Sequence, residues 1–114
     1  MRPSDIKAIK ELRRWHQNHR SGQAFPASKV TFIDPGLLGY DRGMLNLIKD
    51  VHYGKYPWLY VVFFYSTPMM FMWESKEGRE FYIPSRRYST TTTRFQNELR
   101  AFVRDNSPES KDLP

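Results

Sequence analysis

The chain has 114 residues, with 39% hydrophobic and 16% aromatic side chains, no cysteine and a formal net charge of +6. This length suits one domain with a single core, which we place over 1–106, followed by a polar tail over 107–114. The absence of cysteine excludes disulfides and thiolate metal sites and gives no argument for an oxidising compartment. We expect no secretory signal and therefore a cytoplasmic location.

Positive charge is concentrated near the two ends of the chain. Residues 1–20 carry six basic and two acidic side chains, and residues 86–104 carry five arginines and one glutamate. Residues 21–85 carry six of each sign, and residues 105–114 carry one basic and three acidic side chains. Because both basic segments are expected to be helical, this distribution favours an anionic partner such as nucleic acid. The alternative is that the excess charge only keeps a small domain soluble.

The N-terminal segment predicts an amphipathic helix over about 5–20, with Ser4 as its N-cap and Ser21-Gly22 as its end. Apolar residues recur at every third position and form one broad stripe. These residues are Ile6, Ile9, Leu12 and Trp15. Three basic residues fall on the opposite side, namely Lys7, Lys10 and Arg14.

The next segment predicts a loop over 23–28, a short strand over 29–34 and a turn at Asp34-Pro35-Gly36. After it, Asp41 is placed to cap a short helix that ends before Gly54. The apolar positions of that helix have helical spacing. They are Met44, Leu47, Ile48 and Val51.

The most apolar stretch of the chain predicts two adjacent strands, over 58–66 and 69–74. Its aromatic and β-branched residues suit a pleated surface, and Pro68 divides it because proline cannot donate a backbone hydrogen bond. The stretch is too short and too interrupted for a membrane span. A hairpin turn over 75–78 then leads to a returning strand over 79–83.

The last element is a predicted helix over about 91–104, in which Thr93 and Gln96 fit a capping box. Its apolar stripe consists of Phe95, Leu99, Phe102 and Val103.

Together these elements predict an α+β fold, an antiparallel meander of about three or four strands packed by helices from both ends of the chain and a short middle helix. The strands over 58–66 and 69–74 are apolar on both faces. A single layer of short helices leaves one such face uncovered, and uncovered apolar patches commonly meet a partner. On this ground we predict a homodimer.

Three features occur between Tyr65 and Asn97. Thr67-Pro68 opens a strand, Gly78 stands in a hairpin turn, and a block reading Tyr-Ser-Thr-Thr-Thr-Thr-Arg-Phe-Gln-Asn leads into a helix. In these features the chain resembles a small uncharacterised family of phages and other mobile elements, whose block reads Tyr-Ser-x-Thr-Thr-Ser-x-His-Gln-Asn. Phe95 replaces the histidine of that family, so any chemistry of the histidine is absent here. The resemblance implies a phage-like protein in the host cytoplasm and brings no known activity.

The segment from Arg86 to Arg100 is the strongest candidate site. A helix N-terminus offers unpaired amides and partial positive charge, and threonine hydroxyls and arginines add donors for a phosphate. The helix face opposite the apolar stripe carries side chains of the types that contact DNA backbone or base edges. The predicted nucleic-acid-binding residues are Arg86, Arg87, Thr93, Arg94, Asn97, Arg100 and Arg104, with Lys7, Lys10 and Arg14 as a second patch. The alternative is a capped helix with a solvated arginine face.

An enzymatic hypothesis rests on Asp34, Glu74 and Lys76. Metal-dependent nucleases need carboxylates that converge on Mg²⁺ and a lysine beside the attacking water. Glu74 and Lys76 fall at a hairpin turn, where charged side chains are common, and no second carboxylate accompanies Asp34. The nuclease is therefore a remote alternative.

Histidines and exposed aromatic residues give two weaker signals. His16 and His19 share a side of the expected first helix, with His52 far away, whereas zinc needs three or four ligands. We therefore predict no metal site. Among the aromatic residues, those expected to be exposed and able to stack on bases are Tyr53, Tyr56 and Tyr88.

The sequence thus predicts a small accessory protein, of the phage type that the resemblance implies, which binds nucleic acid through two basic helices and has no catalytic residue or cofactor. The main alternative is a protein-binding inhibitor or adaptor of a host or defence complex. No membrane partner is predicted.

Overall fold

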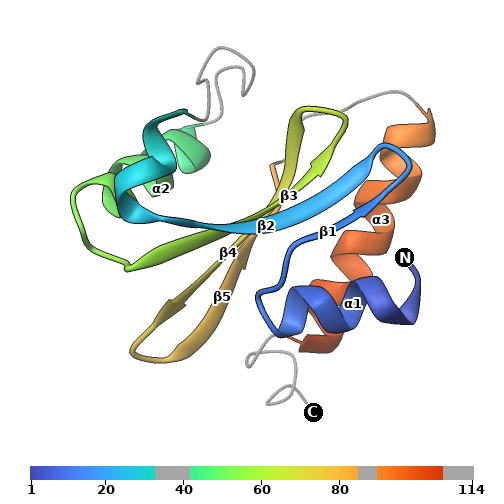
Figure 1. The fold of residues 1–114 in the computed structure, drawn as a ribbon, viewed down its shortest axis with the longest axis horizontal. Coiled ribbons are helices and arrows are strands. Elements are labelled where there is room, and N and C mark those ends of the chain that lie inside the picture. Colours follow the sequence, from blue (N-terminus) through green and yellow to red (C-terminus); the bar gives the residue numbers. More distant parts are fainter. Residues whose placement is uncertain (33–41, 85–89, 107–114) are drawn as a thin grey trace.

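The computed structural model describes residues 1–32, 42–84 and 90–106 and shows one five-stranded antiparallel sheet, in which neighbours along the chain are neighbours in space (Figure 1). The strands are β1 (Trp15–Gln17), β2 (Arg20–Pro26), β3 (Trp58–Phe64), β4 (Thr67–Ser75) and β5 (Gly78–Tyr82). The helices are α1 (Pro3–Lys10), α2 (Arg42–His52) and α3 (Thr90–Asn106), with a 3-10 helix, η1, over Ala27–Phe32. The expected α+β meander is confirmed, with more strands than predicted. The predicted tail over 107–114 lies outside the described residues.

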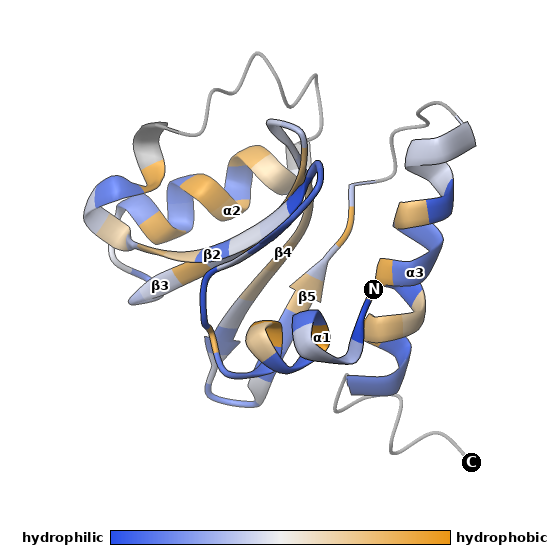
Figure 2. Ribbon diagram, turned by 45° about the vertical axis from the view of Figure 1, so that its right-hand side comes forward, coloured by the Kyte–Doolittle hydropathy of each residue, from blue (hydrophilic) through white to orange (hydrophobic). Residues whose placement is uncertain are grey.

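Helices cover both faces of the sheet. α1 and α3 pack on one face and α2 with η1 on the other, as the side-on view shows (Figure 2). Consecutive residues of β3 therefore enter opposite clusters: Leu59 and Val61 enter the cluster of α2, whereas Tyr60 and Val62 enter the cluster of α1 and α3. All four side chains are fully buried. Burial on both faces explains why β3 reads as a continuous apolar run.

The two-sided cover removes the argument for a homodimer. A homodimer is predicted only from an open apolar face, but within the described residues each face of the central strands β3 and β4 carries a buried cluster. The homodimer stays a prediction, without that support.

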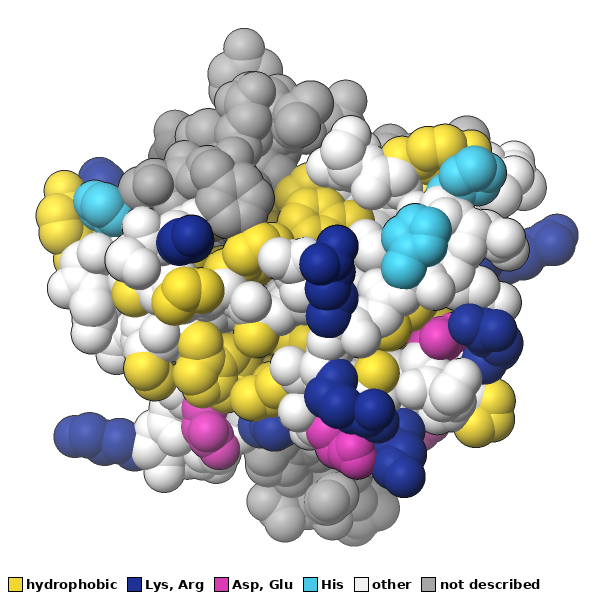
Figure 3. Space-filling view, in the orientation of Figure 1, with side chains coloured by type: hydrophobic (Ala, Val, Ile, Leu, Met, Phe, Trp, Pro, Cys, Tyr) yellow, Lys and Arg dark blue, Asp and Glu magenta, His cyan; other side chains and the backbone are white. Residues whose placement is uncertain are grey.

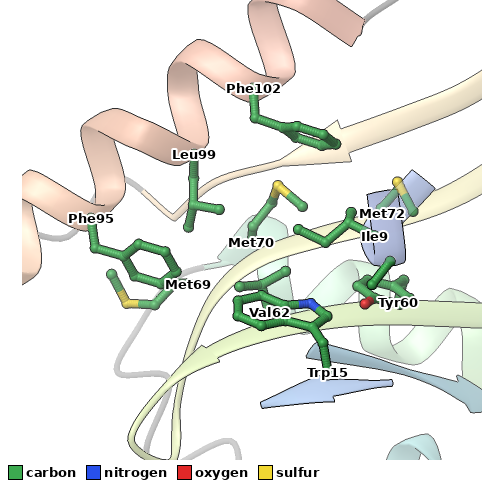
Figure 4. Packing of buried hydrophobic residues seen from close by; sticks show 11 residues of the cluster. Ile9, Trp15, Tyr60, Val62, Met69, Met70, Met72, Phe95, Leu99 and Phe102 are labelled. Atoms are coloured by element: carbon green, nitrogen blue, oxygen red, sulfur yellow. The ribbon is translucent and has the colours of Figure 1, made fainter. Parts of the chain in front are cut away.

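The larger cluster joins α3 to methionines of β4 (Figure 4). A register shift between Val62 and Phe63 interrupts the β3–β4 pairing, and Met69 and Met70 both enter this cluster although they are consecutive. Pro68 lies at this irregularity, opposite Phe63, where a missing backbone donor is tolerated. The predicted strand division at Pro68 is therefore displaced: the turn is at Tyr65-Ser66, and β4 begins at Thr67.

The predicted helix over 5–20 is wrong beyond its first half. α1 ends at Lys10, Leu12 adopts a positive φ of 60°, and residues 15–26 form the β1–β2 hairpin. Of the segment 23–28 predicted as a loop, residues 23–26 lie in β2 and 27–28 begin η1. A spacing of three residues drifts by about 60° per step around a helix, so one face cannot bury the whole stripe. Ser4 is not the N-cap either: the helix begins at Pro3, and the Arg2 amide donates to Asp5 Oδ2 at 3.2 Å.

Trp15 is buried in the hairpin instead, opposite Gly22 on β2. A Cβ at Gly22 would collide with Nε1 of Trp15 and lie 2.8 Å from the Tyr60 hydroxyl oxygen. Glycine therefore leaves the space that the indole fills. The bulky ring and the missing side chain are a matched pair across two strands.

The predicted strand over 29–34 is also wrong, since residues 27–32 form η1, in which Val30 is fully buried against the α2 cluster. The predicted turn at Asp34 and the cap at Asp41 lie outside the described residues. The middle helix is confirmed as α2, and all four of its predicted apolar positions are buried. Gly54, at φ 84°, donates its amide to the Val51 carbonyl just past the helix end.

The hairpin at 75–78, the returning strand and the last helix are confirmed as the β4–β5 turn, β5 and α3. The predicted capping box is wrong because Thr93 and Gln96 both lie inside α3. Gln96 is buried, and its Nε2 donates to the Pro84 carbonyl at 3.4 Å. This side chain ties the helix to the segment that follows β5.

Candidate nucleic-acid interface

α3 presents a polar outer face with three exposed arginines. Phe95, Leu99 and the other apolar residues turn toward the sheet, so Arg94, Arg100 and Arg104 point outward by helical geometry. Arg100 Nη1 donates to Asn97 Oδ1 at 3.0 Å, which holds the guanidinium beside a neutral side chain. Arg104 lies 3.3 Å from Asp105, and both side chains are well exposed, so this pair contributes little.

α1 contributes a second set of exposed cations. Ala8 and Ile9 are buried, whereas Lys7 and Lys10 are exposed on the outer side of the helix. Arg14 is exposed as well, but it lies between α1 and β1 and not on the helix as predicted. The second predicted patch therefore consists of two helical lysines and one arginine in a connecting segment.

Both sets belong to the same layer of the molecule. Residues Ala8 and Ile9 of α1 and Leu99 and Phe102 of α3 enter one buried cluster, and the two helices lie side by side on one face of the sheet (Figure 2). Arg79 of β5 fixes the end of α1 by donating Nη1 to the Lys10 carbonyl at 2.6 Å. We call the outer surface of this layer, with the exposed cations Lys7, Lys10, Arg14, Arg94, Arg100 and Arg104, the α1–α3 surface.

Other basic residues near α1 and α3 are paired with carboxylates. Arg20 Nη1 lies 3.1 Å from Glu98 Oε2, and its guanidinium carbon lies 4.4 Å from the centre of the Phe95 ring. Arg13 lies 3.1 Å from Glu11. Figure 3 shows basic and acidic side chains next to one another at its lower right, in the region of α1. The unpaired positive charge is therefore smaller than the sequence count suggests.

The remaining predicted residues have mixed outcomes. Arg86 and Arg87 lie outside the described residues. Thr93 is half-buried within α3 and takes part in an interaction there, so it is not a free phosphate ligand at a helix start. Asn97 is exposed as predicted. Of the ten predicted residues, the α1–α3 surface thus brings together the six cations and Asn97.

Two residues of the nuclease hypothesis, Glu74 and Lys76, line a shallow hollow at the β4–β5 turn. Its volume is about 540 Å³, and it is lined by Lys55, Tyr56, Glu74, Ser75, Lys76, Glu77 and Glu80. One of these carboxylates is already engaged, because Trp73 Nε1 donates to Glu80 Oε2 at 2.8 Å. Asp34 lies outside the described residues, and the described part of the chain contains no group of three or more potential metal ligands.

The histidines do not share a helix face. His16 lies in β1 and His19 in the β1–β2 turn, where its ring stacks on Tyr65 with 4.2 Å between ring centres and 10° between planes. His52 ends α2 on the opposite side of the sheet, beside Tyr53.

Among the tyrosines predicted to be exposed, Tyr53 is 77% exposed, Tyr56 is half-buried 5.9 Å from Trp73, and Tyr88 lies outside the described residues. Tyr65 is 62% exposed although it is not among the tyrosines predicted to be exposed, since the predicted strand over 58–66 includes it. The exposure of Tyr65 could have been predicted, because two paired strands need a tight turn just before Thr67-Pro68.

Comparisons with protein-family models, with curated proteins and with solved structures found no match to this chain. None of the described helices combines the length and the apolar character that crossing a bilayer requires.

Proposed function

We propose that this chain is a non-enzymatic accessory protein that binds nucleic acid through the α1–α3 surface. The main support for the proposal is that cations from both ends of the chain lie on one layer of the molecule, formed by α1 and α3. Five of the six have no ion pair with a carboxylate among the described residues, and the sixth, Arg104, is paired with Asp105. Unpaired lysines and arginines spread over one side of a small domain suit the phosphate backbone, whose binding releases counterions.

The resemblance to a phage and mobile-element family supports placing this activity in such a setting. A small protein that must find nucleic acid in a host cell benefits from electrostatic attraction, which raises the rate of encounter.

The protein-binding alternative is favoured by a different feature, the hollow at the β4–β5 turn. It is lined by lysines, glutamates and Tyr56, and polar side chains of this kind occur at the rims of protein interfaces. This alternative predicts capture of a specific host protein with little affinity for DNA.

The proposal is tested by fluorescence anisotropy with a labelled duplex DNA between about 50 and 200 mM salt. With four to six phosphate contacts, the logarithm of the association constant should fall with the logarithm of salt at a slope of about −3.5 to −5.5. The double variant Lys7→Glu/Arg100→Glu should bind at least about tenfold more weakly, with a flatter slope.

The matched control is Lys29→Glu/Lys49→Glu. Both lysines are exposed on η1 and α2, across the sheet, and the substitutions change the net charge by the same amount. This control should keep its affinity within about threefold. Absence of binding at low salt, or equal weakening by the two double variants, would contradict the proposal.

A further inference from the structure

The turns of two neighbouring hairpins bring two aromatic rings together at one end of the sheet. His19 belongs to the β1–β2 turn and Tyr65 to the β3–β4 turn, and their rings are nearly parallel at 4.2 Å. The Tyr65 amide also donates to the His19 carbonyl, so the two turns are joined by backbone as well as by rings. Figure 3 shows histidine side chains beside hydrophobic ones over the β1–β2 turn, on the open surface at the upper right.

The rings are open to solvent in spite of this contact. Tyr65 remains 62% exposed and His19 is exposed, so part of the stacked pair is accessible from outside. Most aromatic residues of this chain lie in or against the two clusters, and only Tyr53 and Tyr65 are exposed large hydrophobic residues among those described. An exposed flat ring supported from behind is the arrangement that stacks on a nucleobase.

A short series of ring contacts connects this pair to α3. Tyr65 lies edge-on to Phe64 at 4.9 Å, and Phe64 lies 5.9 Å from Phe95. The residue before Phe95 is Arg94, which is exposed and without an ion pair among the described residues. The aromatic pair thus adjoins the N-terminal half of α3, at one edge of the α1–α3 surface.

The backbone of Tyr65 is in an unfavourable conformation. Its φ is 57°, in the left-handed region that glycine and asparagine adopt readily and that bulky residues rarely adopt. The turn by itself would favour asparagine or glycine at this position. A bulky ring kept exposed in a strained turn is the kind of local feature from which a binding role is inferred.

We propose that the His19–Tyr65 pair stacks on an unpaired nucleobase, and that the phosphates of the same strand lie toward α3. This inference rests on the proposed nucleic-acid binding and specifies the preferred class of ligand, a single-stranded nucleic acid. Bases within a duplex are stacked on one another and present only their edges, whereas an unpaired base offers its ring face.

The experiment compares three labelled probes by anisotropy at one salt concentration: a ten-residue thymidine strand, a strand of equal length in which the central residues are abasic, and a duplex. The first two carry the same number of phosphates and differ only in base rings. The wild-type chain should bind the base-bearing strand about tenfold more tightly than the abasic strand. A uridine strand of the same length then separates DNA from RNA as the source of the base.

Tyr65→Asn should remove this preference, because asparagine tolerates the left-handed conformation but has no ring to stack. His19→Ser should reduce it, and Tyr65→Phe should keep it. Tyr53→Asn is the matched control. Tyr53 is more exposed than Tyr65 and also has a histidine neighbour, His52, at the end of α2 on the other side of the sheet. The rings of Tyr53 and His52 are tilted by 61° and are therefore not stacked. This control should leave the preference unchanged.

The outcomes separate the two proposals. If no probe binds at low salt, the nucleic-acid function fails and this inference fails with it. If the strands with and without bases bind equally, or if both ring-removing variants keep the preference, the stacking site is overturned while the salt-dependent function stands. A strand carrying 5-iodouracil provides a test on the unaltered protein: photo-crosslinking should modify Tyr65 or His19, and modification only elsewhere would contradict the site.

Discussion

At the scale of single residues, the most buried polar group with a clear role is the hydroxyl of Tyr60. The side chain is fully buried, and its hydroxyl donates to the Arg13 carbonyl at 2.7 Å, which joins β3 to the segment after α1. Burial raises the pKa of this hydroxyl well above its ordinary value, and a weaker opposing effect comes from the nearby Trp15 indole. The folded protein therefore keeps Tyr60 protonated at pH values where the unfolded chain releases the proton.

This difference predicts a loss of stability in alkali. A raised pKa in the folded state contributes stability that is complete below about pH 10 and is lost as the pH rises beyond it, by up to about 1.4 kcal/mol per pH unit. Tyr60→Phe should lower the free energy of unfolding by about 1 kcal/mol at pH 7, because the hydrogen bond is lost. The same variant should show a shallower decline than the wild type between pH 9.5 and 11 in urea titrations. Parallel declines in the two proteins would show that Tyr60 does not titrate on unfolding.

At the scale of elements, the main difference from the sequence-based expectation is the hairpin over residues 15–26. Its turn is built at Asn18, whose φ is 55°, and Gln17 pairs with Arg20 across it. A helical stripe with a spacing of three and an alternating strand pattern are hard to distinguish over so few residues. The cross-strand match of Trp15 with Gly22 decides in favour of the hairpin, and it is visible only when the two strands are paired.

Substitutions at Asn18 discriminate between the two structures. In the hairpin, Asn18→Gly should be neutral or slightly stabilising, whereas Asn18→Ala should cost about 1 kcal/mol because alanine resists a positive φ. In a helix the order would be reversed, with alanine favoured over glycine by about 1 kcal/mol. Thermal or urea unfolding of the two variants shows directly whether the glycine or the alanine variant is more stable. A more stable alanine variant would refute the hairpin.

At the scale of the whole molecule, β3 and β4 are shared by two clusters on opposite faces of one sheet. Neither layer of helices has a core of its own without these strands. We therefore expect the domain to unfold in one cooperative transition, as small single domains usually do.

Two adjacent residues test this architecture. Val61 faces α2 and Val62 faces α3, and both are fully buried. Val61→Ala and Val62→Ala should each lower the free energy of unfolding by about 2–3 kcal/mol, and both should shift the same single transition in a urea titration. In a sheet with one solvated face, one of the two substitutions would change stability by less than about 0.5 kcal/mol.

The sequence by itself determined the elements whose signal is local. The apolar run of β3 and β4, the helical spacing in α2 and α3 and the turn before Gly78 were all predictable, because hydrophobic periodicity and turn residues act over a few neighbouring positions. The exposed arginines of α3 followed from the same periodicity, since the residues between the buried positions must face outward.

Only the tertiary structure decided which elements meet. The placement of α1 beside α3, the pairing of Glu98 with Arg20 that reduces the free positive charge, and the stacking of His19 on Tyr65 all join residues far apart in the chain. Such contacts depend on strand order and on the face that each helix covers, which no local pattern encodes. The candidate surface was therefore half predictable: its cations could be named from the sequence, but their common layer and the aromatic pair beside it required the fold.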